Sequence, residues 1–326
     1  MTRAALAWCV GGLVISIIVG LGAGPVQMPA TSWLGALLGE EGTAATILWG
    51  VRLPRVTAAV LTGGSLAVSG AVFQALLRNP LAEPYLLGVS SGAALGVVLA
   101  MVAGISASAF ILLPGAALAG SLLAIVIVFH AARLGGHLDT RVLLLAGVVV
   151  SAFFGACVLL VLTFARVGTL RSAFSWTLGS LEGASWGMIL ALAAYALPAV
   201  AVTLGLSRHL NALALGDDTA AYLGTDAERV KRLAFLLASL LAAASVAVAG
   251  VIGFVGLVVP HAVRLAGVRD HRLLIPLSFS LGGATLVLAD AGARTAAAPM
   301  EIPVGVVTAF VGVPFFLLLL RRSYAR

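Results

Sequence analysis

The sequence predicts an all-α membrane protein with about ten transmembrane helices in each subunit. Hydrophobic residues make up 61% of the chain and charged residues 10%, against roughly 25% charged in an ordinary soluble domain. The mean hydropathy is +1.15. Thirty-eight glycines are spread through the apolar runs, and small residues let helices approach closely in lipid. These observations favour a membrane scaffold and argue against a soluble enzyme.

Ten apolar segments are expected to cross the membrane, each needing ~20 residues. They are residues 6–26, 53–77, 85–104, 109–130, 142–165, 186–206, 233–252, 254–268, 273–291 and 304–320. Segment 254–268 is short and carries His261 and Arg264, so it predicts either a full crossing or a half-crossing buried in protein. We interpret the first segment as an uncleaved span rather than a secretory signal. Residues 1–326 are thus expected to form a single transmembrane domain.

The basic residues predict the orientation. With ten crossings and the N-terminus inside, 14 of the 19 Lys and Arg residues fall at cytoplasmic ends, as the positive-inside rule requires. The remaining five lie outside; they are Arg52, Arg55, Arg166, Arg171 and Arg294. Because the basic residues are scattered rather than gathered in a stripe, topology explains them better than nucleic-acid binding does.

One long polar segment, residues 207–232, interrupts the apolar chain on the predicted cytoplasmic side. It holds eight charged residues and is expected to form two short amphipathic helices broken at Gly216 and Gly224. Asp217 and Asp226 are placed to cap the helices that follow. A compact element between two spans indicates contact with something in water.

A weak internal repeat is also present. The segment 67–80, AVSGAVFQALLRNP, matches the segment 247–260, AVAGVIGFVGLVVP, at five of 14 positions. By the count of spans the two copies run in opposite directions, which would give the inverted-repeat halves of many transporters. A shared bias toward Ala, Val and Gly explains the match equally well.

The order of several motifs resembles the permease subunits of type II ABC importers, which carry iron–siderophore complexes, haem or cobalamin. The motifs are RLPRVTAAVLTGGSLAVSGAVFQALLRNPLAEPYLLGVSSGAALG (52–96), LLLAGV (143–148), ALGDDTAAYLG (214–224), GFVGLVVPHAVRLAGVRDHRLLIP (253–276) and ADAGARTAAAPMEIPVGVVTAFVGVPFF (289–316). The resemblance implies a homodimer around a central pathway, two cytoplasmic subunits that bind ATP and Mg, and a periplasmic or lipid-anchored substrate-binding protein. It also implies an inner (cytoplasmic) membrane location, lipid contact, and no cofactor or nucleic acid on this chain.

The resemblance assigns three arginines on the outer face to docking of the binding protein. They match Arg52, Arg55 and Arg294, and a carboxylate on the partner would give each a charge-assisted pair. Two alternatives stay open for these arginines. They are snorkelling at the interface and a local partner such as Glu301 or Asp290. For Asp290 itself, an i, i+4 pair with Arg294 is favoured over a proton-relay role.

Two short segments match the loops that close the cytoplasmic mouth in this family. The first holds Asn79 and Leu81, and the second holds Thr140 and Arg141. Arg141 departs from the family pattern, where a small polar residue is common, so it either lines the pathway or points to the cytoplasm as a topology anchor.

The polar segment matches the coupling helices that sit in a groove of each ATPase subunit. The residues assigned to coupling are Leu213, Leu215, Gly216, Asp217, Tyr222, Leu223 and Gly224. The leucines and the tyrosine would supply apolar contacts, inside a polar rim of Asp217, Asp218, Asp226 and Arg229. The alternative is a solvated hairpin on the lipid surface.

No catalytic or metal site is predicted. The five histidines lack metal-ligand spacing, no GxxxxGK[ST] motif occurs, and Lys231 is the only lysine. The chain is therefore expected not to be an enzyme, with ATP hydrolysed by a separate subunit. Iron–siderophore is the expected cargo, with haem and cobalamin as alternatives. An ion-coupled secondary transporter and an intramembrane enzyme are the competing classes; the first would carry acids in its spans and the second a catalytic pair.

Overall fold

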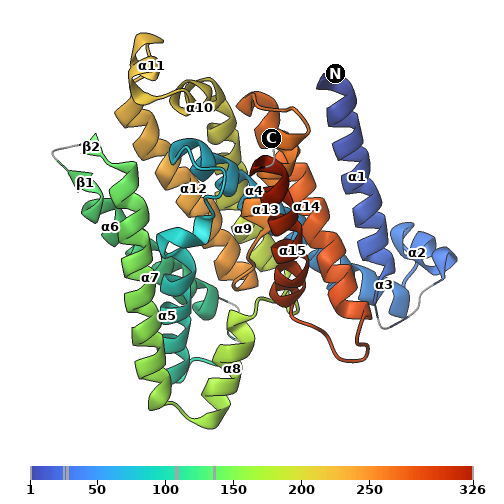
Figure 1. Cartoon of the computed structure of the whole chain (residues 1–326). Coiled ribbons are helices and arrows are strands. Elements are labelled where there is room, and N and C mark those ends of the chain that lie inside the picture. The colour runs from blue at the N-terminus through green and yellow to red at the C-terminus, as the bar shows by residue number, and fades with distance from the viewer. Residues whose placement is uncertain are drawn as a thin grey trace.

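The computed structural model describes residues 2–24, 26, 29–106, 109, 111–134 and 137–324 as a bundle of helices (Figure 1). In chain order the helices are α1 (Thr2–Gly22), α2 (Ala30–Leu37), α3 (Thr43–Ile47), the π-helix η1 (Leu48–Arg52), α4 (Leu53–Leu76), the 3-10 helix η2 (Pro84–Leu87), α5 (Val89–Val102), α6 (Leu112–Ala131), α7 (Thr140–Thr163), α8 (Val167–Thr177), α9 (Trp186–Gly205), α10 (Ser207–Ala214), α11 (Asp217–Tyr222), α12 (Ala227–Ala249), α13 (Val255–Leu265), α14 (His271–Thr295) and α15 (Val304–Tyr324). Two short strands, β1 (Arg133–Leu134) and β2 (His137–Leu138), pair antiparallel with Arg133 opposite Leu138.

Helix α4 forms the centre of the bundle and is buried along nearly its whole length. It packs against α12, α13 and α14. Glycines allow this approach: a Cβ atom on Gly63 would lie 2.3 Å from the carbonyl oxygen of Gly282. On Gly70 it would lie 1.7 Å from the carbonyl oxygen of Gly256. The expected use of glycine for close helix packing is therefore confirmed at these contacts.

Each predicted apolar segment contains one apolar helix of the described chain. Six helices are long and apolar enough to cross a membrane, and four shorter apolar helices accompany them. The shorter ones are Ala7–Gly22, Val89–Val102, Val255–Leu265 and Val304–Leu318. Pro25 and Phe110, inside the first and fourth predicted segments, lie outside the described residues. The chain is thus a multi-pass helical protein, and the number of ten crossings stays a prediction.

Segment 254–268 forms a short helix after a break in the chain. Helix α13 has 11 residues, which at 1.5 Å per residue reach about 16 Å, roughly half of the hydrocarbon core. The break before it is partly buried and is held by two side chains. The Glu83 carboxylate accepts from the Phe254 N–H at 2.8 Å, and the Tyr85 hydroxyl accepts from the Ile252 N–H at 3.1 Å. This arrangement fits the half-crossing alternative, since irregular backbone is tolerated in a membrane where protein satisfies it.

The two segments of the proposed repeat differ in structure. Residues 67–76 continue α4 without interruption, whereas 247–260 spans the end of α12, the break and the start of α13. The last turns of α4 and of α13 also lead to the same end of the molecule, because Arg78 contacts α11 and Asp270, after α13, contacts α10. These segments are therefore not structural equivalents, and shared composition explains their likeness.

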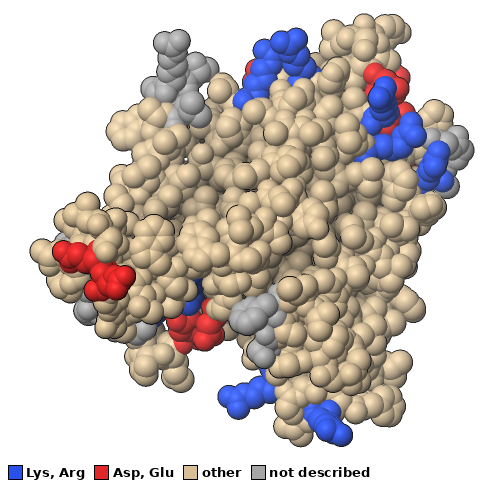
Figure 2. Space-filling view, turned by 180° about the vertical axis from the view of Figure 1, so that it is seen from behind, with Lys and Arg blue, Asp and Glu red and all other residues tan. Residues whose placement is uncertain are grey.

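Charged side chains gather at the two ends of the molecule, with a broad uncharged belt between them on the face drawn in Figure 2. One end carries α10, α11, the β1–β2 pair and the N-terminus of α1, and we call it the hairpin end (Figure 1). The opposite end carries α2, α3 and α8. The belt has the distribution expected of a surface that contacts lipid.

Candidate functional site

The polar segment folds as two short helices that project from the hairpin end (Figure 1). Gly216 (φ 124°) and Gly224 (φ 75°) take backbone conformations that favour glycine, and each ends a helix as predicted. Asp226 caps α12 by accepting from the Arg229 N–H at 3.0 Å, which confirms that prediction. Asp217 caps nothing: the residue before α11 is Gly216, and the Asp217 side chain instead forms ion pairs.

The exposed surface of this segment is apolar at three of the predicted coupling positions. Leu215 is 69% exposed, Tyr222 92% and Leu223 63%. Leu213 is the exception, because it is only 2% exposed and packs with Ala212, Ala220 and Val230. Its expected place on the contact surface is therefore wrong; it belongs to the small core that holds α10, α11 and α12 together.

A polar cavity of about 720 Å³ opens beside this segment at the hairpin end. Its lining includes Arg78 from the end of α4, Asp217 from α11, and Glu228 and Lys231 from α12. The predicted gate residues Thr140 and Arg141 line the same cavity from the start of α7. Two segments that the sequence treated separately, the coupling segment and one gate segment, are thus neighbours.

The start of α7 is held by an aspartate outside the membrane-spanning part. The Asp139 carboxylate accepts from the Arg141 N–H at 2.8 Å and from the Val142 N–H at 3.3 Å. These backbone donors hold the pKa of Asp139 below its ordinary value. The Arg141 side chain is exposed, which agrees with its departure from the small residues of the family pattern.

The second predicted gate segment is a tight turn after α4. The Asn79 side chain accepts from the Leu81 N–H at 2.9 Å, and both residues are partly exposed. Gln74 braces the turn by donating to the carbonyl oxygens of Ala82 and Leu257. Asn79 and Leu81 do not line the polar cavity, but Arg78, directly before them, does.

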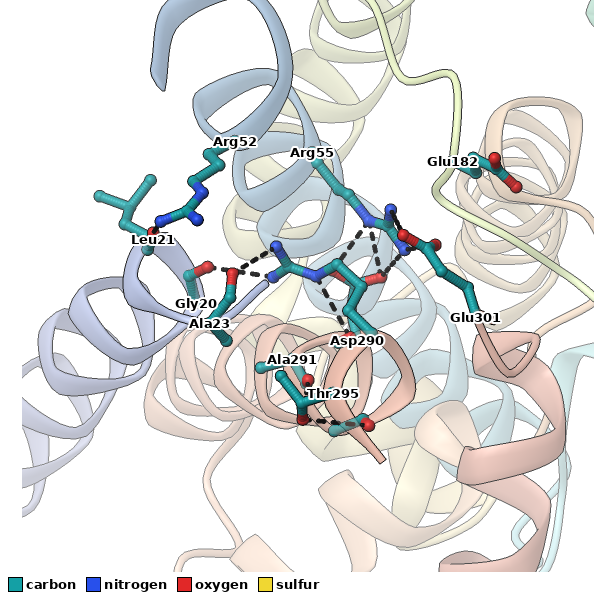
Figure 3. Close-up of polar contacts among 12 residues, drawn as sticks. Gly20, Leu21, Ala23, Arg52, Arg55, Glu182, Asp290, Ala291, Thr295 and Glu301 are labelled. Atoms are coloured by element: carbon teal, nitrogen blue, oxygen red, sulfur yellow. Dashed lines mark hydrogen bonds and ion pairs between the residues drawn. The ribbon is translucent and has the colours of Figure 1, made fainter. Parts of the chain in front are cut away.

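The three predicted docking arginines lie together near the opposite end, inside a network of internal contacts (Figure 3). Arg55 donates to Asp290 from Nε at 3.0 Å and from Nη2 at 2.9 Å, and pairs with Glu301 at 2.8 Å. Arg294 pairs with Asp290 at 3.0 Å, the predicted i, i+4 contact, which is confirmed. Arg294 also donates to the carbonyl oxygens of Gly20 and Ala23, at the end of α1.

Arg52 completes this network through backbone groups. It donates to the carbonyl oxygens of Leu21 and Gly22, the last residues of α1, and of Val26, beyond its end. Arg52, Arg55 and Arg294 are only 4%, 6% and 4% exposed. For Arg55 and Arg294 the contacts are those of the local-partner alternative, with both named acids engaged. The docking role stays a prediction.

Sequence reasoning missed two sets of contacts. Glu83 and Tyr85, which hold the break before α13, were quoted in a motif without a role. Lys231 was noted only as the single lysine, yet its side chain is 9% exposed and pairs with Asp217. A solitary lysine among many arginines, and an acid between two prolines of a turn, were the available signals.

Comparisons with known proteins agree on one kind of protein. A sequence profile described as the FecCD transport family matches residues 12–322. The cobalamin import system permease protein BtuC of Halobacterium salinarum is 45% identical over 291 residues, 88% of this chain and 77% of the relative. The hemin transport system permease protein HmuU of Yersinia pestis is 43% identical over 319 residues, 96% and 95% of the two chains. A solved structure described as an inward-facing metal-chelate type ABC transporter matches with a TM-score of 0.86 and 30% identity, over 98% and 99% of the two chains.

Proposed function

Because the chain belongs to the FecCD transport family, we propose that it is the permease subunit of an ABC importer that moves a large metal chelate through the inner membrane. The observation that carries the proposal is the polar segment, where three large apolar side chains stand exposed at the ends of two short helices, outside the uncharged belt. A groove on an ATPase subunit would cover them. Asp218, Asp226 and Arg229 are exposed around them and would form the polar rim.

The cargo is a metal chelate, and the names of the relatives decide which chelates to test first. Their names include a cobalamin and a hemin system, so cobalamin and haem are to be tested first. Iron–siderophore, the cargo expected from the family in general, is tested beside them. The cargo reaches the chain from a substrate-binding protein, two copies of the chain enclose the pathway, and separate subunits bind ATP and Mg.

An ion-coupled secondary transporter is not favoured. Asp290, the acid in a late span, is held by two arginines, and its side chain is 1% exposed. A proton relay needs an acid that exchanges protons with water along a path. Asp290 is instead engaged in ion pairs with Arg55 and Arg294, away from water.

The function is tested by asking whether the polar segment binds an ATPase. The double variant Leu215→Asp/Leu223→Asp places two charges in the proposed apolar contact, where each unpaired buried charge costs several kcal/mol. We expect copurification of a co-expressed ATPase subunit to fall more than about tenfold. Uptake of labelled cobalamin, haem or ferric siderophore into proteoliposomes that also contain the binding protein should fall with it.

The matched control is Leu38→Asp, the same exchange at an 84% exposed leucine near the opposite end. It should leave ATPase copurification unchanged. Wild-type copurification and uptake by the double variant would refute the coupling role of the segment. Absence of ATP-dependent uptake of every chelate by the wild-type complex would refute the importer.

We also assign docking of the binding protein to the opposite end. The buried arginines there already hold internal acceptors, so a partner's carboxylate has to replace one. Glu301 is the acceptor available for exchange, because its side chain is 28% exposed while that of Asp290 is 1% exposed. Arg55 would then pair with the partner while it keeps Asp290.

The gate assignment predicts crosslinks between two copies of the chain. If Asn79–Leu81 and Thr140–Arg141 close the cytoplasmic mouth at the dimer axis, cysteine at Leu81 or Thr140 should form a disulfide across the dimer when the Cα atoms come within about 7 Å. The background lacks Cys9 and Cys157, which are both free. Crosslinking, measured on non-reducing gels, should block uptake and change with the nucleotide bound to the ATPase. Failure at both positions in every nucleotide state would exclude this gate.

A further inference from the structure

We propose that Asp217 is a positioning residue that links the ATPase-binding segment to the predicted gate, through Arg78 on one side and Lys231 on the other; this rests on the function proposed above. Asp217 begins α11. Its Oδ1 atom pairs with Arg78, which follows α4, and its Oδ2 atom pairs with Lys231 in α12. One carboxylate thus joins three elements at the wall of the polar cavity.

The Lys231 side of this contact differs from an ordinary surface ion pair, which contributes little, whereas the Arg78 and Asp217 side chains are each 43% exposed. The Lys231 side chain is 9% exposed, and a buried ammonium group needs an anionic partner. Lys231 is also the chain's only lysine. Asp217 is therefore held from the α12 side, and any displacement of α11 pulls on the Lys231 contact or carries α12 with it.

Arg78 connects the same carboxylate to the gate. It lies directly before Asn79, and its φ of 48° places it in the left-handed region, which is uncommon for a residue other than glycine. Arg78 and Phe254 are the non-glycine residues with positive φ in the described part of the chain. The turn at Arg78 is thus constrained by its backbone and by its contact with Asp217, so a shift of α11 is transmitted to the next residues, Asn79 to Leu81.

A parallel contact reaches the other gate segment. The Glu228 carboxylate, in the first turn of α12, accepts from the Leu138 N–H at 2.9 Å. Leu138 ends β2, two residues before Thr140. Both predicted gate segments are therefore tied to α11 and α12 through acidic side chains, and Asp217 is the one that lies on the ATPase-binding segment itself.

The test separates coupling from ATPase binding. In proteoliposomes with the full complex, Asp217→Asn should keep wild-type ATPase copurification, while the ATP hydrolysed per chelate transported rises about fivefold or more. Arg78→Gln should have the same effect. The double variant should be no worse than Asp217→Asn alone, because Asp217→Asn already removes the contact that Arg78→Gln removes. Asp217→Glu, which keeps the charge, should restore coupling.

The control is Arg321→Gln, an exposed arginine late in α15, which should leave the ratio unchanged. Full coupling in Asp217→Asn, additive effects in the double variant, or loss of ATPase copurification in Asp217→Asn each overturn the linkage. If Asp217→Asn does not fold, Arg78→Gln and its charge-keeping counterpart Arg78→Lys decide the matter. A wild-type complex without ATP-dependent uptake overturns the importer and the linkage together, whereas the first three outcomes overturn the linkage alone.

Discussion

Alanine in place of Gly70 is expected to prevent stable packing of the helix bundle. Its Cβ atom would lie 1.7 Å from the carbonyl oxygen of Gly256 and 2.5 Å from the carbonyl carbon. Both atoms are backbone, so no side chain can rotate away, and α13 would have to separate from α4. Overpacking commonly costs about 1–3 kcal/mol, and we expect this rigid contact to exceed that range. Thermal unfolding in detergent and the yield of monodisperse protein measure the effect.

The matched control is Gly11→Ala in α1, where a Cβ atom would meet nothing within 4 Å. Alanine is favoured over glycine in a helix by about 1 kcal/mol, so this variant should unfold at the wild-type temperature or above it. If Gly70→Ala unfolds at the same temperature as Gly11→Ala, helices α4 and α13 are not packed as closely as the contact between Gly70 and Gly256 implies.

The sequence predicted the apolar segments because a helix in lipid needs a long run of apolar residues, and this requirement is local. The glycine turns at Gly216 and Gly224 and the cap at Asp226 were predictable for the same reason. The i, i+4 pair of Asp290 with Arg294 also follows from helix geometry within one element.

Contacts between distant elements were not predictable in this way. Aspartate is a residue type that often caps helices, but the carboxylate of Asp217 pairs with Arg78 and Lys231 from two other elements. Leu213 looks like its neighbour Leu215, yet one faces the small core and the other faces water. Only the assembled packing decides these orientations. The short helices α2, α3 and α8 were missed because they lie between apolar segments without a strong pattern of their own.

Loss of the Asp290 carboxylate is expected to destabilise the opposite end of the molecule strongly. Among the described residues, Asp290→Ala leaves Arg55 without one of its two acids and Arg294 without its one paired acid, and both arginines are almost fully buried. Breaking a buried ion pair by removing one partner costs about 3–5 kcal/mol. Because Arg294 also binds the end of α1, that helix should loosen first. Thermal unfolding of the purified protein and hydrogen exchange at residues 20–23 report the two effects.

Glu301→Gln is the control that separates the two acids of this network. Glu301 is the more exposed acid, and Arg55 keeps Asp290 in this variant, so the free energy of unfolding should change by less than about 1 kcal/mol.

The same variant also tests docking. Removing the exchangeable acceptor frees Arg55 for a partner's carboxylate and should strengthen binding-protein association at low salt. If Asp290→Ala is as mild as Glu301→Gln, the arginines do not depend on internal acids, and direct docking through all three becomes the better interpretation. If only Asp290→Ala is severe, the network is a structural clamp, and Glu301 is the part of it that a binding protein can exchange.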